Sequence, residues 1–148
     1  MQPDKALDSF VSQLVNKGYR IDLFTNGSID FKKHQWVFHP HVSIIMDWKL
    51  RGSGEAETLL NVRSANRKLL GAKDSVKFVV KDRADLNEAH QWLNYWGGLP
   101  LHRVYFSPAW DKMNPAEIVA FIEDNQLHTA YLNIQTHKYV WDPKARRT

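Results

Sequence analysis

Polar side chains that could bind a ligand or transfer a proton follow five apolar segments of this sequence, at the point where each segment ends. In chain order these polar ends are Thr25-Asn26-Gly27, Asp47-Trp48-Lys49, Lys81-Asp82, Ser107-Pro108 and Gln135-Thr136-His137-Lys138. Carboxylates, amides, hydroxyls, imidazoles and amines are the groups that hold polar ligands and act as acids and bases. Each end alone has a plainer explanation, because Asn-Gly forms turns and Ser-Pro stops strands. Their recurrence predicts a site without specifying its chemistry.

The apolar segments alternate with helical patterns, and this alternation determines where the polar ends lie. Strands are predicted near residues 20–24, 42–46, 75–80, 102–106 and 129–134, and helices at 7–15, 59–70, 86–96 and 115–122. About five βα units of this kind predict an α/β fold with a parallel sheet and right-handed crossovers. Two architectures stay open, a doubly wound sheet and part of a β/α barrel. Both place chemistry beyond the carboxyl ends of the strands.

Capping residues mark several of the predicted helix ends. Gly18 and Gly71 occupy positions where a glycine ends a helix. Asn114-Pro115 is typical of a helix start. The spacing of Asp85 and Glu88 is that of a capping box, which predicts that the third helix starts at Asp85.

Composition excludes several classes of protein. The chain has 148 residues, enough for one domain with a core, and a formal net charge of +4. It contains no cysteine, which excludes a disulfide framework, thiolate zinc sites, a cysteine nucleophile and an iron–sulfur cluster ligated by this chain. No apolar stretch is long enough to cross a membrane, and the first residues lack signal-peptide character, so a cytoplasmic location is expected. The basic tail, Lys144, Arg146 and Arg147, is expected to be solvated.

Three further patterns have weaker functional interpretations. Gly52-Ser53-Gly54 lacks the spacing of a dinucleotide-binding loop, although its backbone N–H groups could still face an anion. His34, His39 and His41 lie close in sequence but lack a clear further ligand for a metal ion. Trp92 and Trp96 share a helix face and are expected in the core. Trp48 and Trp110 follow strand ends, where they could contact an aromatic ligand or cover the sheet.

The segment Leu132-Asn133-Ile134-Gln135-Thr136-His137-Lys138-Tyr139 resembles the C-terminal signature of the 7-carboxy-7-deazaguanine synthases, which are radical S-adenosylmethionine enzymes. The resemblance continues upstream in the same order, at Phe24-Thr25-Asn26-Gly27-Ser28, at Met46-Asp47-Trp48-Lys49 with Gly52-Ser53-Gly54-Glu55, at Asp74-Ser75-Val76-Lys77-Phe78-Val79-Val80 and at Ser107-Pro108. It covers residues 3 to 141, and the Gln-x-His-Lys ending is its most specific part.

This resemblance implies an incomplete β/α barrel and a radical ring contraction. The reaction converts 6-carboxy-tetrahydropterin to 7-carboxy-7-deazaguanine with release of ammonia, for the synthesis of queuosine or of modified DNA. The family uses S-adenosylmethionine, a 4Fe-4S cluster and Mg²⁺. The resemblance further implies that Thr25, Asn26, Gln135, His137 and Lys138 bind the substrate. It places the cofactor side at Asp47, Lys49, Ser53 and Ser107, and it assigns no catalytic or metal-binding residue to this chain.

The chain also departs from the family pattern. The C-x₃-C-x₂-C cluster motif and a G-G-E-P motif are absent, and Phe24 stands where the family has a Glu. Residues 1–148 are therefore expected to form a single domain that matches the C-terminal portion of the barrel, without its first two strands. Such a chain is expected to be inactive alone, with an N-terminal half in trans or a homodimer as its partner. The alternative is a binding protein for a pterin or purine nucleotide that uses the same strand ends. No membrane contact is expected, and the diffuse charge argues against direct nucleic-acid binding.

Overall fold

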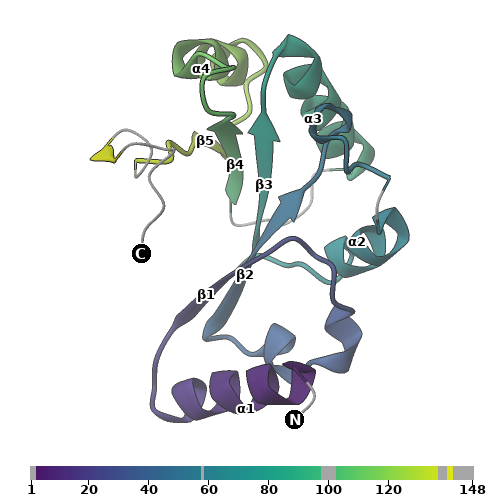
Figure 1. Ribbon diagram of the computed structural model, residues 1–148, viewed down its shortest axis with the longest axis vertical. Helices are drawn as coiled ribbons and strands as arrows, with labels where there is room; N and C mark the ends of the chain where they lie inside the picture. The colour runs from purple at the N-terminus through teal and green to yellow at the C-terminus, as the bar shows by residue number, and fades with distance from the viewer. Residues whose placement is uncertain (1–2, 58, 98–102, 137–139, 142–148) are drawn as a thin grey trace.

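The computed structural model describes residues 3–57, 59–97, 103–136 and 140–141, in which strands and helices alternate (Figure 1). The strands are β1 (Ile21–Thr25), β2 (Val42–Trp48), β3 (Ser75–Val80), β4 (Arg103–Pro108) and β5 (Ala130–Leu132). The α-helices are α1 (Pro3–Asn16), α2 (Leu60–Arg67), α3 (Arg83–Tyr95) and α4 (Pro115–Asp124). Short 3-10 helices are η1 (Phe31–Lys33), η2 (Gln35–Phe38) and η3 (Arg51–Ser53). The predicted α/β class with an all-parallel sheet is confirmed.

The five strands form one sheet in the order β1-β2-β3-β4-β5, and every neighbouring pair is parallel. Strand order therefore follows chain order without reversal. A doubly wound sheet reverses its direction at one point so that helices cover both faces. A sheet that continues in one direction, with crossovers of one hand, places its helices on the same face. The fold is thus the winding of a partial β/α barrel, and the doubly wound alternative is wrong.

The carboxyl ends of the first three strands are staggered. Thr25, the last residue of β1, lies opposite Met46, whereas β2 continues to Trp48. Trp48 in turn lies opposite Phe78, whereas β3 continues to Val80. A constant stagger between neighbouring strands is the shear that a sheet needs to curve into a barrel. The residues that follow the strands are therefore offset along the sheet axis.

The two faces of the sheet differ in chemistry, because side chains alternate along each strand. The core face carries Val42, Ile44, Met46, Trp48, Val76, Phe78, Val80, Val104 and Phe106, all of them buried. Helix α4 packs on it through Phe121, whose ring lies 6.4 Å from that of Phe106. The opposite face, called the open face below, carries Asp22, Phe24, Ser43, Asp47, Lys77, Arg103, Tyr105, Ser107 and Tyr131. Its side chains are mostly polar, and Phe24 is 69% exposed.

Tryptophan packing closes the core over β2. Trp48 is 2% exposed, and its ring lies 4.9 Å from Trp92 and 4.8 Å from Trp96 in edge-to-face contacts. Trp96 also stacks on Phe78 at 6.0 Å. Edge-to-face and offset pairs of this kind add to the stability gained from burial alone. Trp92 and Trp96 therefore pack against the core as predicted. The ligand-facing interpretation of Trp48 is wrong, because its side chain points to the core face.

The helix ends confirm some capping predictions and correct others. Gly18 has a φ of 82°, and Gly18 N donates to Val15 O, so it ends α1 as predicted. Asn114 caps α4 through a hydrogen bond from Ala116 N. The prediction that Asp85 starts α3 is wrong, because Asp82 is the N-cap and accepts from Asp85 N. The predicted second helix is shorter than expected. It ends at Arg67, and Gly71 instead donates its N–H to Asp74.

A partly buried polar cluster attaches α1 to the rest of the fold. Asp8 Oδ1 accepts a hydrogen bond from Trp36 Nε1 at 2.5 Å and lies 2.6 Å from Nδ1 of His34, which is 3% exposed. These two hydrogen bonds, that from His34 the larger, hold the pKa of Asp8 below its ordinary value. A group with a lowered pKa stabilises the fold above its unfolded pKa and loses that contribution as the pH falls through the folded value.

Replacing Asp8 with asparagine is therefore expected to flatten the acid limb of the stability curve. The free energy of unfolding of the wild-type chain should fall as the pH drops below about 4, the unfolded pKa of an aspartate. The D8N chain should be less stable than wild type at neutral pH and show a smaller fall. Urea unfolding at a series of pH values measures both effects, with D124N, at the exposed end of α4, as the control. An unchanged acid limb in D8N would contradict this role.

None of the helices in the described part of the chain combines the length and the apolar character needed to cross a bilayer.

Candidate functional site

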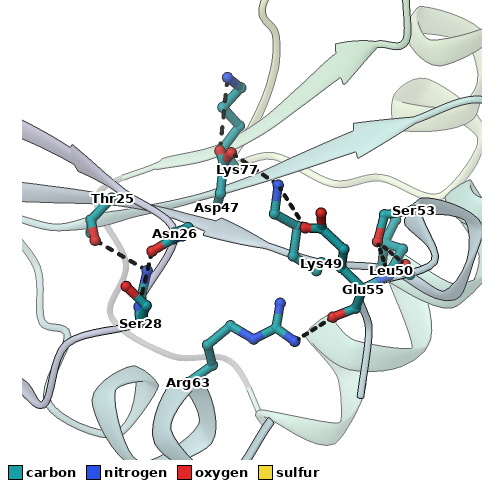
Figure 2. Close-up of polar contacts among 11 residues, drawn as sticks. Thr25, Asn26, Ser28, Asp47, Lys49, Leu50, Ser53, Glu55, Arg63 and Lys77 are labelled. Atoms are coloured by element: carbon teal, nitrogen blue, oxygen red, sulfur yellow. Dashed lines mark hydrogen bonds and ion pairs between the residues drawn. The ribbon is translucent and has the colours of Figure 1, made fainter. Parts of the chain in front are cut away.

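Charged side chains from β2, β3 and the loop after β2 meet at the carboxyl side of the open face (Figure 2). Asp47 lies between two lysines, with Oδ2 at 3.7 Å from Lys49 Nζ and Oδ1 at 3.8 Å from Lys77 Nζ. Lys49 also lies 3.8 Å from a carboxylate oxygen of Glu55. Asp47 and Lys77 are partly buried, with side chains 30% and 18% exposed, whereas the Glu55 side chain is 65% exposed. Partial burial reduces screening, so the cluster presents both signs of charge to a polar ligand.

The chain turns sharply just after β1, and the two polar residues there hold the turn. Gly27 N donates to Thr25 Oγ1 at 3.1 Å, and Ser28 N donates to Asn26 Oδ1 at 3.0 Å (Figure 2). Side-chain-to-backbone bonds of this kind are typical of tight turns. The Asn26 side-chain oxygen is thereby engaged, whereas its amide nitrogen makes no hydrogen bond with the described residues. Thr25 and Asn26 therefore fix the geometry of this end of the site.

Gly27 allows the turn to lie against β2 and α2. Its φ is 70°, a left-handed conformation that favours glycine. A Cβ at this position would lie 2.9 Å from Met46 Sδ and 3.1 Å from Arg63 Cγ. Two constraints, one conformational and one steric, therefore require glycine here.

Asn66 on α2 anchors the loop that follows this turn. Its Oδ1 accepts from Phe31 N at 2.9 Å, and its Nδ2 donates to Gly27 O at 3.0 Å and to Ile29 O at 2.6 Å. Asn66 is fully buried, and backbone groups that lose a buried partner cost free energy. One side chain thus fixes the position of the loop across 39 residues of sequence separation.

The loop containing η3 packs against the start of α3. A Cβ on Gly52 would lie 2.2 Å from Asp85 Oδ1, so only glycine fits beside this buried carboxylate. Asp85 itself accepts from Lys81 N at 3.0 Å. Ser53 Oγ donates to Leu50 O and accepts from Glu55 N, so its hydroxyl shapes the loop (Figure 2).

Arg63 joins the η3 loop to α2. Its guanidinium donates to Glu55 O at 2.8 Å and to Ala56 O at 2.6 Å. The residue is 3% exposed, and this burial lowers the pKa of the Arg63 guanidinium. Arg63 also lines a small pocket of about 50 Å³ whose walls include Asn26 and Lys49. The structure thus brings two predicted site residues, Asn26 and Lys49, together around this arginine.

The other end of the open face lies on β4 and the segment after β5. Ser107 is fully buried, and its Oγ donates to Asn133 Oδ1 at 3.1 Å. Lower on the same face, Arg103 donates to the Tyr105 hydroxyl at 3.4 Å, which raises the pKa of the arginine. The Arg103 guanidinium also lies 5.1 Å from the Tyr131 ring centroid. This end of the face combines hydroxyl, amide and aromatic groups.

The predicted site residues therefore occupy two regions of the site. Thr25, Asn26, Asp47, Lys49 and Ser53 lie at the β1–β2 end. Ser107 lies on β4, and Gln135 follows β5 and is partly buried. His137 and Lys138 lie outside the described residues. Neighbouring strands are about 4.8 Å apart, so a ligand that reached from β1 to β5 would span roughly 19 Å.

Sequence reasoning missed three residues of the site, Lys77, Arg63 and Asn133. A signal for Lys77 is present, because a lysine between the core residues Val76 and Phe78 must point to the other face of the sheet. Arg63 carried no such signal, since arginines on amphipathic helices are usually exposed.

The donor groups of this chain do not fit an iron–sulfur cluster. Such clusters are held by cysteine thiolates, and the sequence has no cysteine. Within the described residues no group of three or more histidine, aspartate or glutamate side chains is placed to hold a metal ion. No chemical step is therefore derived through a cluster or a metal held by these residues.

Comparison with known proteins gives the context for this site. No protein-family model matches the chain. A 7-carboxy-7-deazaguanine synthase from Clostridium acetobutylicum is 33% identical over 127 residues, which cover 86% of this chain and 56% of that protein. A 7-carboxy-7-deazaguanine synthase from Koribacter versatilis is 28% identical over 156 aligned residues, covering 97% of this chain and 66% of that protein. The chain thus spans less than two thirds of the length of either relative.

Both matches cover nearly all of this chain and only a part of each relative, which is consistent with a C-terminal portion. The parallel sheet, with its helices on one face and its polar side chains on the other, agrees with the partial barrel that the resemblance implied. The chain is therefore similar, over nearly all of its length, to a portion of the 7-carboxy-7-deazaguanine synthases.

Proposed function

We propose that this chain supplies the substrate-binding and S-adenosylmethionine-binding side of a 7-carboxy-7-deazaguanine synthase. The observation that supports this most directly is the polar open face, which carries the Asp47–Lys77 pair and the Ser107–Asn133 hydrogen bond on neighbouring strands. The sheet is roughly 19 Å wide from β1 to β5, which leaves room for two ligands side by side. In this proposal 6-carboxy-tetrahydropterin is converted to 7-carboxy-7-deazaguanine and ammonia.

In this proposal each of the two ligands is bound by residues from both ends of the open face. Thr25, Asn26 and Gln135 bind the pterin, together with His137 and Lys138. Asp47, Lys49, Ser53 and Ser107 face S-adenosylmethionine. The Asp47 carboxylate suits this role because S-adenosylmethionine carries positive charge at its sulfonium and ammonium groups. Gln135 suits the pterin because an amide can both donate to and accept from the edge of the ring.

The radical chemistry needs an electron source that this chain does not hold. A 4Fe-4S cluster supplies the electron when it is bound, and its thiolate ligands are absent from this chain. We therefore propose that the chain is inactive alone and acts with a cluster-bearing N-terminal part, supplied in trans or as another segment of a longer protein. A homodimer alone would not solve this, because both copies lack cysteine. The proposed place of action is the cytoplasm.

A second candidate function is binding without catalysis, of a pterin or a purine nucleotide on the same face. The absence of cysteine from the chain favours it, because a binding role needs no redox centre. Mixing experiments separate the two candidates. Product should form only when the chain is combined, under reducing conditions with S-adenosylmethionine, with the part of the Clostridium acetobutylicum relative that it does not match. Ligand binding without product in that mixture would favour the second candidate.

The binding roles are tested by titrating the full chain with 6-carboxypterin, a stable oxidised analogue, and separately with S-adenosylmethionine. D47N is expected to weaken S-adenosylmethionine binding about tenfold and to leave 6-carboxypterin binding nearly unchanged. Q135A is expected to weaken 6-carboxypterin binding by a similar factor and to leave S-adenosylmethionine binding nearly unchanged. Isothermal titration calorimetry measures both.

Matched controls are D124N on α4 and Q13A on α1, which change the same residue types at exposed positions. Both should bind the two ligands as the wild-type chain does. If the wild-type chain bound neither ligand, or if D47N and Q135A bound both as the controls do, the open face would not be the ligand site.

A further inference from the structure

A groove runs between α2 and α3, on the helical side of the sheet and away from the open face. It encloses about 1430 Å³, and the η3 loop closes one end. Aromatic side chains of α3, Trp92, Tyr95 and Trp96, form much of one wall. Ligand pockets of known proteins are commonly several hundred Å³, with mostly apolar walls and few polar groups. This groove is larger and more polar than such pockets, and its aromatic wall on α3 is the part that resembles them.

The polar group that distinguishes this groove is Arg67, on the last turn of α2. Its side chain lines the groove although the residue is only 4% exposed. The guanidinium lies 4.8 Å from the ring centroid of Trp96. Among the described residues no oxygen accepts a hydrogen bond from it, and its buried Nε has no hydrogen-bond acceptor. Burial lowers the pKa of Arg67 to about 10, and no carboxylate offsets this effect.

A buried guanidinium without an anion is costly, because the charge has lost water and gained no counter-charge. Four carboxylates line the groove, none of them offsets the charge of Arg67, and three of them are engaged elsewhere. Asp82 accepts from Asp85 N, Asp85 accepts from Lys81 N, and Glu88 accepts from the backbone N of Arg51. These acids are engaged in local capping and loop contacts. Arg67 therefore has no counter-charge among the described residues, and the neighbouring exposed Lys68 adds a second positive charge to this part of the groove.

We propose that this groove binds a small anion that carries an aromatic ring, with a carboxylate or phosphate on Arg67 and the ring against Trp92 and Tyr95. The planar fork of a guanidinium matches the oxygen pairs of both anions. Tyr95 is 81% exposed, so its ring is available for contact. Trp96 is less available, because Phe78 and Arg67 already pack on it. This site does not depend on the proposed function, because it shares Lys49 with the open face but neither Asp47 nor Gln135, the residues through which that function is tested.

Four probes test the proposal on the full chain: phenyl phosphate, benzoate, inorganic phosphate and acetate. The first two carry a ring, and the last two are the same anions without one. At least one of phenyl phosphate and benzoate should bind and change the fluorescence of the groove tryptophans. The same anion without the ring, inorganic phosphate or acetate, should bind at least about tenfold more weakly. The member of the ring-bearing pair that binds more tightly identifies the anion as phosphate or carboxylate. Calorimetry gives the affinities.

Variants of Arg67 separate a ligand-binding role from a structural one. R67M removes the charge and should weaken binding at least about tenfold, whereas R67K should retain part of it. The control R20M removes an exposed arginine far from the groove and should not change binding. Because R67M also removes a buried unpaired cation, its melting temperature without ligand should equal or exceed that of the wild-type chain.

Three results would overturn the proposal. The first is that no probe binds at a concentration of roughly 10 mM. A dissociation constant above that concentration would be too weak for a small-molecule site. The second is equal affinity of wild type and R67M. The third is a lower melting temperature of R67M together with lost binding in both R67M and R67K, which would make Arg67 a structural residue. Failure on these points leaves the open-face proposal standing, because that proposal is tested through Asp47 and Gln135, which do not line the groove.

Discussion

Replacing Gly27 with alanine is expected to lower the free energy of unfolding by about 3 kcal/mol. The left-handed backbone costs a non-glycine residue about 1–2 kcal/mol, and forcing a methyl group into packed surroundings costs typically 1–3 kcal/mol more. The methyl group would lie 2.9 Å from Met46 Sδ and 3.1 Å from Arg63 Cγ. Either neighbour must move, and Arg63 lines the small pocket at the β1–β2 end of the site. Urea unfolding measures the loss.

The chain offers a matched control for this substitution. Gly54 has nearly the same backbone conformation, with φ 72° against 70° for Gly27, but a Cβ there would meet nothing within 4 Å. G54A should therefore show only the conformational cost, about 1 kcal/mol. The difference between the two variants isolates the steric contribution. Equal effects of G27A and G54A would show that the close approach to Met46 and Arg63 contributes nothing.

Replacing Asn66 with alanine is expected to lower the free energy of unfolding by about 3 kcal/mol or more. The substitution leaves three backbone groups, Phe31 N–H and the carbonyls of Gly27 and Ile29, without their partner. A buried polar group that loses its partner costs about 1–3 kcal/mol. Partial entry of water would keep the sum below three full penalties. Chemical denaturation followed by circular dichroism measures this loss.

Asn61 is the matched control, because it lies exposed on the same helix. N61A should change stability by no more than about 0.5 kcal/mol, in the favourable direction, since alanine is the better helix former. Hydrogen exchange provides a local measurement. The Phe31 amide should lose protection in N66A and keep it in N61A. Retained protection of Phe31 in N66A would contradict the anchoring role of Asn66.

These two substitutions also test how the site is held together. Gly27 and Asn66 contact no ligand in our proposal, yet they position the turn that carries Thr25 and Asn26. If the proposal is right, destabilising the loop should weaken 6-carboxypterin binding. The effect of N66A should exceed that of N61A, because hydrogen bonds to Asn66 fix the loop and Asn61 makes none with the described residues.

Local sequence signals were sufficient for the alternation of strands and helices. Hydrophobic periodicity depends only on neighbouring residues, so β3 could be predicted at residues 75–80 from its own segment, and the structure places it there. Asn114-Pro115 likewise marks the start of α4 through contacts within one turn. The boundaries of α3 were less predictable, because Asp82 and Asp85 both have capping chemistry and only the fold selects Asp82.

Part of the candidate site was also predictable. In a parallel sheet the carboxyl ends of the strands share one edge, so residues at strand ends were expected there, and Asp47 and Lys49 do form an ion pair. The choice between the two architectures was not predictable, because periodicity reports that a segment is a strand and not which strand lies beside it. The strand order decided that question, and with it the face of the sheet on which the helices of the described residues pack.

The sequence by itself therefore determined the α/β class, the positions of the elements and the polar strand ends, because each depends on local periodicity and turn chemistry. It also determined that this chain lacks thiolate ligands for a cluster. Only the tertiary structure showed that Lys77 joins Asp47, that Asn66 holds a loop 39 residues away, and that Arg67 is buried without a counter-charge among the described residues. These three features depend on contacts between segments that are distant in the sequence, and the packing of the whole core determines which of those contacts form.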